Sequence, residues 1–133
     1  MDCIFCKIAH KEIPSHLIYE DVSAVGILDI HPRTPGHVLV LPKAHVVSIK
    51  EVPSESVGDI FLAVKNITTL LEEKLKPDGF TIGINHGEIA GQEVPHLHVH
   101  IMPRWRDDGG GCIQSIVQYQ KESVEEIKKK ILS

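Results

Sequence analysis

The stretch Pro95-His96-Leu97-His98-Val99-His100-Ile101-Met102-Pro103 decides the fold, because histidine and aliphatic residues alternate along it. Side chains of a β-strand point alternately to its two faces, so this alternation predicts a strand over 97–102. The three histidines then share one face, and Leu97, Val99 and Ile101 share the other. We expect the aliphatic face to pack on a helix and the histidine face to open on a cleft.

The spacing of the three histidines limits what they can bind together. Neighbouring histidines on a strand lie about 6.6 Å apart and the outer two about 13 Å apart, whereas a zinc–nitrogen bond is only about 2.0 Å long. Two adjacent histidines could share an ion, but all three could not without a strong distortion of the strand. Separate roles for the three are therefore the simpler interpretation.

One such role is nucleophilic attack on phosphorus. A neutral imidazole is a competent nucleophile near neutral pH, because its pKa lies close to about 6.5. The opposite ring nitrogen must be held by an acceptor, so that the attacking nitrogen carries the lone pair. His98 has a histidine on each side and is the natural candidate.

The loop over 85–94 precedes the histidine strand directly. Its glycines, Gly87 and Gly91, allow unusual backbone angles and the close approach of a ligand. Backbone N–H groups in such a loop can form a concavity that binds an anion. Asn85 and Gln92 add neutral side-chain donors, so the loop is a candidate phosphate cradle.

The rest of the chain predicts strands and helices in alternation. Pro53 to Ser56 opens a helix whose apolar residues recur at helical spacing up to Leu75, with Ser56 and Asp59 loosely resembling a capping box. Ser123 and Glu126 form the capping pair of a second helix over 123–132. Further strands are expected over 17–21, 24–29, 38–41 and 80–85. This order predicts an α+β domain, an antiparallel sheet with helices packed on it.

Length and composition limit the classes of protein to which the chain can belong. The 133 residues suit one domain over 1–133, with 42% hydrophobic residues, 24% charged residues and a net charge of −4. The chain shows no basic surface and no apolar run of about 18 residues, so we expect neither a nucleic-acid nor a membrane partner. The start lacks the features of a secretory signal, which predicts a cytoplasmic protein. Three cysteines indicate a metal or thiol pair rather than a disulfide framework.

The segment Gly91-Gln92-x-Val94-x-His96-x-His98-x-His100 resembles the signature of the histidine triad (HIT) superfamily. The resemblance covers roughly residues 2–105. It implies a five-stranded sheet with one long and one C-terminal helix, and a homodimer whose two sheets join into one ten-stranded sheet. The matching segments are Ile4-Phe5-Cys6-Lys7-Ile8, Lys11-Glu12-Ile13-Pro14, Tyr19-Glu20-Asp21, Leu28-Asp29-Ile30-x-Pro32, Pro35-Gly36-His37-x-Leu39-Val40 and Pro42-Lys43-x-His45.

The same resemblance implies hydrolysis or transfer at the α-phosphate of purine nucleotides, including nucleoside phosphoramidates and dinucleoside polyphosphates. His98 would form a nucleotidyl-histidine intermediate, and His37 would orient or polarise the triad. The phosphate would lie against His100, Gln92, Gly91 and Asn85, the ribose against Asp29, and the base among Phe5, Ile8, Ile27 and Ile30.

Glu93 departs from many relatives, which carry Ser or Thr there. A hydroxyl can donate a hydrogen bond to a phosphate oxygen, and an ionised carboxylate cannot. Glu93 either turns away and offers its backbone N–H or acts on the leaving group. The sequence therefore leaves the preferred leaving group open, along with the choice between adenine and guanine.

A second site is indicated by Cys3-x-x-Cys6, a weak motif alone. His45 is a candidate third ligand and His96 a candidate fourth, which together make an ordinary tetrahedral zinc set. Prokaryotic-type HIT proteins with a Cys-x-x-Cys zinc site are similar at these places. Since protein fills all four positions, such a zinc would be structural and would pin the N-terminal segment to the triad strand.

Three functions remain in competition on the sequence alone. The first is covalent catalysis by His98. The second is a metal-assisted phosphohydrolase, in which triad members hold an ion that activates water. The third is a nucleotide-binding regulatory module with little turnover, since a fold does not fix a function.

Overall fold

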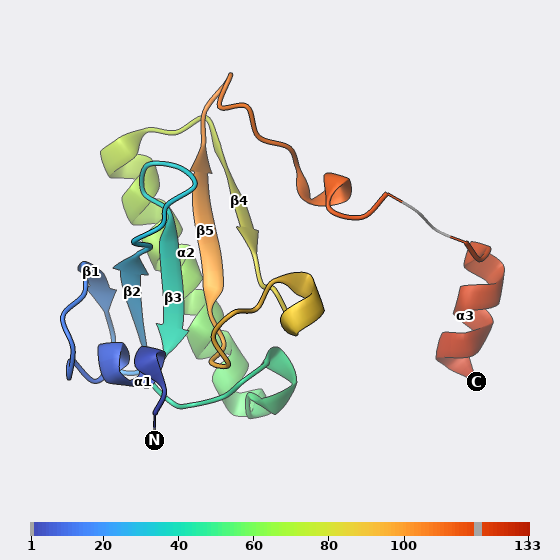
Figure 1. Ribbon diagram of the computed structural model, residues 1–133, viewed down its shortest axis with the longest axis horizontal. Helices are drawn as coiled ribbons and strands as arrows, with labels where there is room; N and C mark the ends of the chain where they lie inside the picture. The colour runs from blue at the N-terminus through green and yellow to red at the C-terminus, as the bar shows by residue number, and fades with distance from the viewer. Residues whose placement is uncertain (1, 119–120) are drawn as a thin grey trace.

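The computed structural model describes residues 2–118 and 121–133 and has an antiparallel five-stranded sheet with strand order β1-β2-β3-β5-β4 (Figure 1). The predicted α+β fold is therefore confirmed. The strands are β1 (Leu17–Glu20), β2 (Ala24–Leu28), β3 (Val38–Pro42), β4 (Gly79–Gly83) and β5 (Val99–Arg104). The helices are α1 (Ile4–Ala9), α2 (Val57–Leu75) and α3 (Val124–Leu132), with short 3₁₀ turns η1 (Ile49–Glu51), η2 (Ser54–Ser56), η3 (Glu88–Ala90) and η4 (Ile113–Ser115).

Helix α2 covers one face of the sheet and carries the predicted apolar stripe. Its buried residues pack with Leu97, Val99 and Ile101, the aliphatic side of the histidine stretch. Gly26 on β2 permits this close packing, because a Cβ there would lie 2.6 Å from Cδ1 of Ile67. The buried residues of α2 are Ile60, Ala63, Val64, Ile67 and Leu71.

Helix α1 lies on the opposite face and was not predicted from the sequence. Its six residues are too few to show a helical period. Cys3 is its N-cap, and the Cys3 thiol accepts a hydrogen bond from the backbone N–H of Cys6 at 3.4 Å. Phe5 and Ile8 bury themselves in a second apolar cluster with Val25, Ile27, Leu39 and Leu41.

The last strand begins two residues later than predicted, at Val99 rather than Leu97. The register pairs Val40 with Val99, so that Pro42 would face Leu97. Proline has no N–H with which to continue the ladder. The N–H of Leu97 instead donates to the carbonyl of Val46 at 2.7 Å. The segment over 94–98 is therefore irregular, which frees its carbonyls for other contacts.

The helix termini differ in how well the sequence predicted them. The N–H of Glu126 donates to the Ser123 hydroxyl at 3.2 Å, as expected for the cap of α3. Ser56 makes no side-chain cap at α2, because the turn η2 precedes that helix instead, so the resemblance to a capping box was wrong. Helix α3 stands apart from the sheet in Figure 1 rather than packing on it.

Among residues 2–118 and 121–133, no helix combines the length and the apolar character that crossing a bilayer requires.

Candidate active site and metal site

His98 is held by a backbone carbonyl that fixes its tautomer. Its Nδ1 lies 2.8 Å from the carbonyl oxygen of His96. A carbonyl only accepts hydrogen bonds, so Nδ1 carries the proton and Nε2 carries the lone pair. The Phe5 ring meets the imidazole edge-on, with ring centroids 5.0 Å apart. The arrangement provides the acceptor that a nucleophilic imidazole needs.

His37 and His100 form a second ordered pair. The backbone N–H of Arg33 donates to Nδ1 of His37 at 3.2 Å, so the remaining His37 proton is on Nε2. His37 Nε2 then donates to Nδ1 of His100 at 3.0 Å. Nε2 of His100 is left as an N–H donor beside His98, whose ring centroid is 5.1 Å away. Asp29 Oδ2 lies 3.7 Å from His37 Nε2.

A glycine in the left-handed region positions His37. Gly36 has φ of +81°, and a Cβ at this position would collide with Leu75 on α2. Both the backbone angle and the contact require glycine there. The turn over 30–36 therefore places His37 directly before β3, where its side chain is only 3% exposed.

Burial keeps this pair of imidazoles neutral. Desolvation, with smaller effects from His98 and His37, lowers the pKa of His100 to about 4. Desolvation also lowers the pKa of His37, although the nearby Asp29 carboxylate opposes it. Both rings are uncharged near neutral pH, as the donor and acceptor assignments above require.

The depressed pKa of His100 predicts a loss of stability in acid. A histidine in the unfolded chain titrates near about 6.5, whereas His100 in the folded protein has a pKa of about 4. Between these values the unfolded state binds a proton that the folded state does not. The free energy of unfolding therefore falls as pH falls from about 6.5 to about 4, and then levels off. We expect His100→Gln to remove up to roughly 3 kcal/mol of this loss, measured by urea titration across that range.

The exposed His86 provides the control for this experiment, since His86→Gln should leave the pH dependence unchanged. Equal slopes for wild type and His100→Gln, compared at the same metal content, would contradict the assignment.

The loop over 85–94 folds around the Gln92 side chain. Gln92 Oε1 accepts from the Gly87 N–H at 2.9 Å, and Nε2 donates to the carbonyls of Val47 at 2.8 Å and Val94 at 3.3 Å. The amide that the resemblance gives to the phosphate is thus engaged in holding the loop. Gly87 and Gly91 have φ of +92° and +107°, as glycine-dependent turns require.

Three other residues of the predicted nucleotide site have less constrained side chains. Asn85 lies against Gly91, where a Cβ would stand 3.4 Å from Nδ2 of Asn85. Glu93 is exposed. Ile30 is 74% exposed, whereas the base-site residues Phe5, Ile8 and Ile27 are buried in one cluster. Ile30 therefore stands outside that cluster.

Cys3, Cys6, His45 and His96 come together as the sequence predicts. Their Sγ and imidazole nitrogen atoms all lie within 4.8 Å of one another. His96 Nε2 donates to the Pro42 carbonyl at 2.9 Å, which leaves the lone pair on Nδ1, 3.4 Å from the Cys3 sulfur. His45 Nδ1 lies 3.2 Å from the Cys6 sulfur. Two thiols and two imidazoles, of which His96 presents the lone pair of Nδ1 to the cluster, fit a tetrahedral zinc ion.

The electrostatics of the thiol pair agree with a cation site. Burial and the neighbouring Cys3 thiol raise the pKa of Cys6. The Cys6 thiol therefore resists ionisation until a cation compensates the charge, and metal binding then releases its proton. The cluster can therefore hold a metal ion.

A HIT domain model matches residues 10–107 of the chain. The chain belongs to the HIT family. A HIT family protein from Bacillus subtilis has a solved structure with a TM-score of 0.86 and 37% identity, over 99% of this chain and 96% of that one. The adenosine 5'-monophosphoramidase of Schizosaccharomyces pombe is 38% identical over 110 residues, which are 83% of this chain and 80% of that protein.

A third HIT relative bears on the metal site. The crystal structure of a zinc-bound histidine triad family protein from Mycobacterium smegmatis has a TM-score of 0.77 and 36% identity, over 99% of this chain and 91% of that one. The sequence match and the cluster of ligand atoms agree that a HIT chain of this type can carry a metal.

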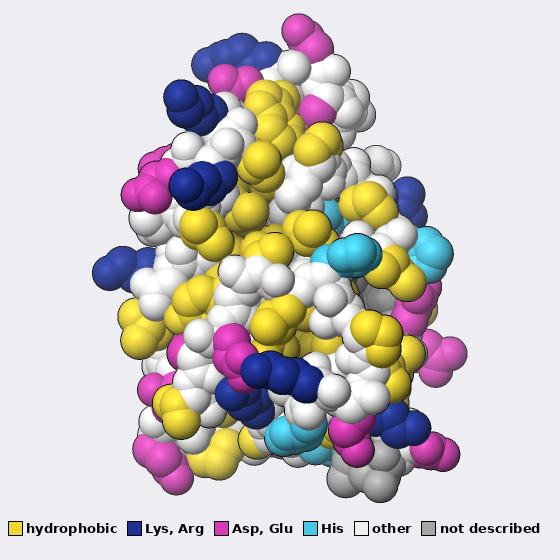
Figure 2. Space-filling view, turned by 90° about the vertical axis from the view of Figure 1, so that its left-hand side faces the viewer, with side chains coloured by type: hydrophobic (Ala, Val, Ile, Leu, Met, Phe, Trp, Pro, Cys, Tyr) yellow, Lys and Arg dark blue, Asp and Glu magenta, His cyan; other side chains and the backbone are white. Residues whose placement is uncertain are grey.

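The surface at the β1 edge of this HIT chain mixes charges. Figure 2 shows basic and acidic side chains interspersed around a band of hydrophobic ones, with a few exposed histidines between them. His10, His16 and His31 are exposed and stand outside both clusters described above.

Sequence reasoning missed the backbone groups that orient the HIT histidines. The carbonyls of His96 and Pro42 and the N–H of Arg33 fix three imidazole tautomers. Every residue has a backbone carbonyl, so no sequence pattern predicts which carbonyl orients a side chain. The sequence gives a weak indication only for Arg33, which lies four residues before His37 in a turn rich in proline.

Proposed function

We propose that this HIT protein hydrolyses or transfers the nucleotidyl group at the α-phosphate of purine nucleoside phosphoramidates or dinucleoside polyphosphates. The observation that carries the proposal is the His98 imidazole, with Nδ1 bonded to the His96 carbonyl and Nε2 left with its lone pair. A nucleophile with its opposite nitrogen held by an acceptor is what attack at phosphorus requires.

In the proposed first step, His98 Nε2 bonds to the α-phosphorus. The bond from phosphorus to the leaving nitrogen or oxygen breaks, and its electron pair departs with the leaving group. The His96 carbonyl stabilises the positive charge that develops on the imidazole. His100 donates through Nε2 to a phosphate oxygen, because the His37 N–H occupies its Nδ1. Water then attacks phosphorus and restores His98.

The proposed nucleotide lies across the α1 side of the sheet. The base packs among Phe5, Ile8 and Ile27, with Ile30 covering it, and the Asp29 carboxylate accepts from the ribose hydroxyls. The phosphate of the proposed nucleotide lies against Gly91, Asn85 and the backbone of Glu93. Gln92 shapes this cradle through the loop, or turns its amide to the phosphate when the nucleotide binds. The name of the Schizosaccharomyces pombe relative favours a phosphoramidate as substrate.

We propose zinc as the metal of the Cys3, Cys6, His45 and His96 cluster. Bound zinc would supply a closed structural crosslink, since four protein ligands leave it no open position. The residues themselves tie α1 to the segment before β5, which places Phe5 against His98. Reduced thiols at this site agree with a cytoplasmic protein.

The proposed homodimer would form through β4. This strand is at the edge of the sheet, and its five residues are all half-buried. An edge strand presents unpaired N–H and carbonyl groups that can pair with another copy. Two such edges would give the ten-stranded sheet, and sedimentation equilibrium should then give twice the mass of the chain.

The strongest alternative is a metal-assisted hydrolase. Its supporting observation is a second cluster, in which atoms of Asp29, His37 and His100 lie within 4.8 Å of one another. The hydrogen bonds argue against it, because His37 Nε2 carries a proton and donates a hydrogen bond to His100 Nδ1. A metal would have to displace that proton and break the pair.

A substrate panel tests the proposed function. Adenosine and guanosine phosphoramidates and diadenosine polyphosphates should release the nucleoside monophosphate, detected by ion-exchange chromatography. The metal-assisted alternative predicts that chelation abolishes turnover without any nucleotidyl-protein adduct. A regulatory module predicts mononucleotide binding and no product over long incubation, which would refute the proposal.

A further inference from the structure

The turn η4 and the helix α3 leave many apolar side chains in solvent. We call their described residues, 112–118 and 121–133, the C-terminal arm, and none of these residues is buried. A cluster of exposed apolar side chains of this kind marks an interaction surface. The large apolar side chains of the arm that are 57–74% exposed are Ile113, Ile116, Val117, Val124, Ile131 and Leu132.

Helix α3 has the sequence of an amphipathic helix that needs a surface to pack on. Val124, Ile127 and Ile131 recur at helical spacing, and glutamate and lysine occupy the positions between them. Its nine residues are too few for stability in water, because isolated helices below about 12–15 residues are marginal. Figure 1 shows that the sheet of its own chain does not cover it.

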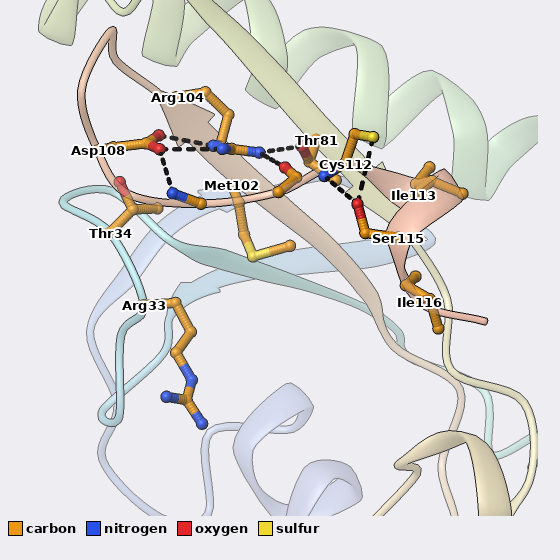
Figure 3. Close-up of a pocket in the computed structure, with 12 residues that line it drawn as sticks. Arg33, Thr34, Thr81, Met102, Arg104, Asp108, Cys112, Ile113, Ser115 and Ile116 are labelled. Atoms are coloured by element: carbon orange, nitrogen blue, oxygen red, sulfur yellow. Dashed lines mark hydrogen bonds and ion pairs between the residues drawn. The ribbon is translucent and has the colours of Figure 1, made fainter. Parts of the chain in front are cut away.

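Hydrogen bonds after β5 fix the place where the arm begins (Figure 3). Arg104 donates to the Asp108 carboxylate at 2.6 and 2.9 Å and to the Gly111 carbonyl at 2.6 Å. The N–H of Arg106 donates to the carboxylate of Asp78, directly before β4, at 2.8 Å. The arm therefore starts at the β4 side of the sheet. Figure 1 shows it leading from there past β4 and away from β1.

The first residues of the arm lie on the histidine face of the sheet. Thr81 of β4 is paired with Met102 of β5, and Met102 follows His100 on the same side of its strand. Thr81 and Met102 line a cavity of about 400 Å³ together with Ile113 and Ile116 (Figure 3). The exposed apolar side chains of the arm are thus continuous with the edge strand.

Pairing of two β4 strands alone would make a small interface. A five-residue strand is about 17 Å long and a sheet about 10 Å thick, so the paired edge covers roughly 170 Å² of each copy. A stable interface buries about 800 Å² on each partner. Side chains around the edge must supply the difference, and those of the arm begin beside it.

The charges of α3 favour a protein surface over a lipid surface. Glu125 and Glu126 are followed by Lys128, Lys129 and Lys130, so its polar side carries both signs of charge. Helices that lie on anionic membranes have a mainly basic polar side. A folded protein with interspersed charges is the better match.

We propose that the C-terminal arm of each copy packs on the other copy of the homodimer. Two antiparallel copies of one edge strand are related by a twofold axis, which places both histidine faces on the same side of the joined sheet. A second copy joined at β4 occupies the side past which the arm of the first extends. It covers Ile116, Val117 and the apolar side of α3. This exchange of arms rests on the proposed homodimer and goes beyond it.

Photo-crosslinking from α3 identifies the surface that covers it. Ile131→p-benzoylphenylalanine, in the full-length zinc-loaded protein, carries a ketone that bonds on irradiation to the nearest C–H group. We expect the main product to be a covalent dimer of twice the chain mass on denaturing electrophoresis. The matched control is Val22→p-benzoylphenylalanine, because Val22 is 93% exposed and lies between β1 and β2, at the other end of the strand order. It should give no covalent dimer.

Ile116→Asp tests the arm through the strength of the dimer. We expect it to raise the dissociation constant at least about a hundredfold, because twofold symmetry removes the burial of this side chain twice in each dimer. Val22→Asp should leave the constant unchanged. Fluorescence-detected sedimentation over a dilution series measures both variants, and circular dichroism should show the wild-type fold in each. An unchanged constant in Ile116→Asp would overturn the proposal.

The outcomes of crosslinking separate the exchange of arms from the proposed homodimer. Adducts within single chains, or no adduct from Ile131, would overturn the exchange and leave a dimer joined through β4 standing. A wild-type chain that sediments as a monomer would refute the homodimer and the exchange together. Turnover of the substrate panel is measured independently and decides the proposed reaction by itself.

Discussion

His98→Asn is expected to lower kcat/KM for nucleoside phosphoramidates by at least about a thousandfold, because it removes the nucleophile of the proposed reaction. Asparagine can still donate a hydrogen bond from its amide, so the His96 carbonyl need not lose its partner. The nucleotide should still bind, since the residues proposed to hold the base and ribose are unchanged. Steady-state kinetics and equilibrium dialysis with a mononucleotide measure the two effects separately.

The control for this variant is His86→Asn, which changes an exposed histidine in the loop before the triad. It should retain wild-type kinetics. If His98→Asn kept more than about a tenth of the activity, a role as nucleophile would be untenable.

Removal of the metal is expected to lower the melting temperature by about 10 °C or more. A ligand at about a thousand times its Kd stabilises the folded state by about 4 kcal/mol, and each kcal/mol moves the melting temperature of a chain of this size by about 3 °C. The cluster joins α1 to the segment before β5, and both Cys3 and His96 are buried. Differential scanning calorimetry with and without a chelator measures the shift.

Cys3→Ala should reproduce the melting temperature of the metal-free protein and should no longer respond to chelator. Cys112→Ser provides the matched control, because Cys112 is exposed and lies outside the cluster. It should bind one zinc per chain and melt like wild type. A chelator shift below about 2 °C in wild type would argue against a structural metal.

The sequence predicted those parts of the fold in which apolar residues recur periodically or in which proline and glycine mark a turn. The alternation through His96, His98 and His100 placed the histidines opposite the α2-facing residues, and the stripe up to Leu75 predicted α2. The fold confirms both. The turn ending at Gly36 was marked by its prolines and glycine, and it positions His37 beside the triad.

The other parts of the fold depend on contacts between residues that are distant in the sequence, and no local pattern predicts such contacts. Helix α1 is six residues long and owes its place to burial of Phe5 and Ile8. The late start of β5 follows from Pro42 on the neighbouring strand, which local alternation does not reveal. The engagement of Gln92 with Gly87, Val47 and Val94 likewise arises only once the loop is closed.

Rapid-quench trapping of the nucleotidyl adduct tests the central claim most directly. Wild-type protein mixed with an adenosine phosphoramidate labelled in the nucleotide should yield, within the first turnover, an acid-labile adduct that peptide mass spectrometry assigns to His98. His98→Asn should yield none, and His100→Gln should still yield the adduct, more slowly. Turnover without any adduct, or an adduct on another residue, would contradict the account.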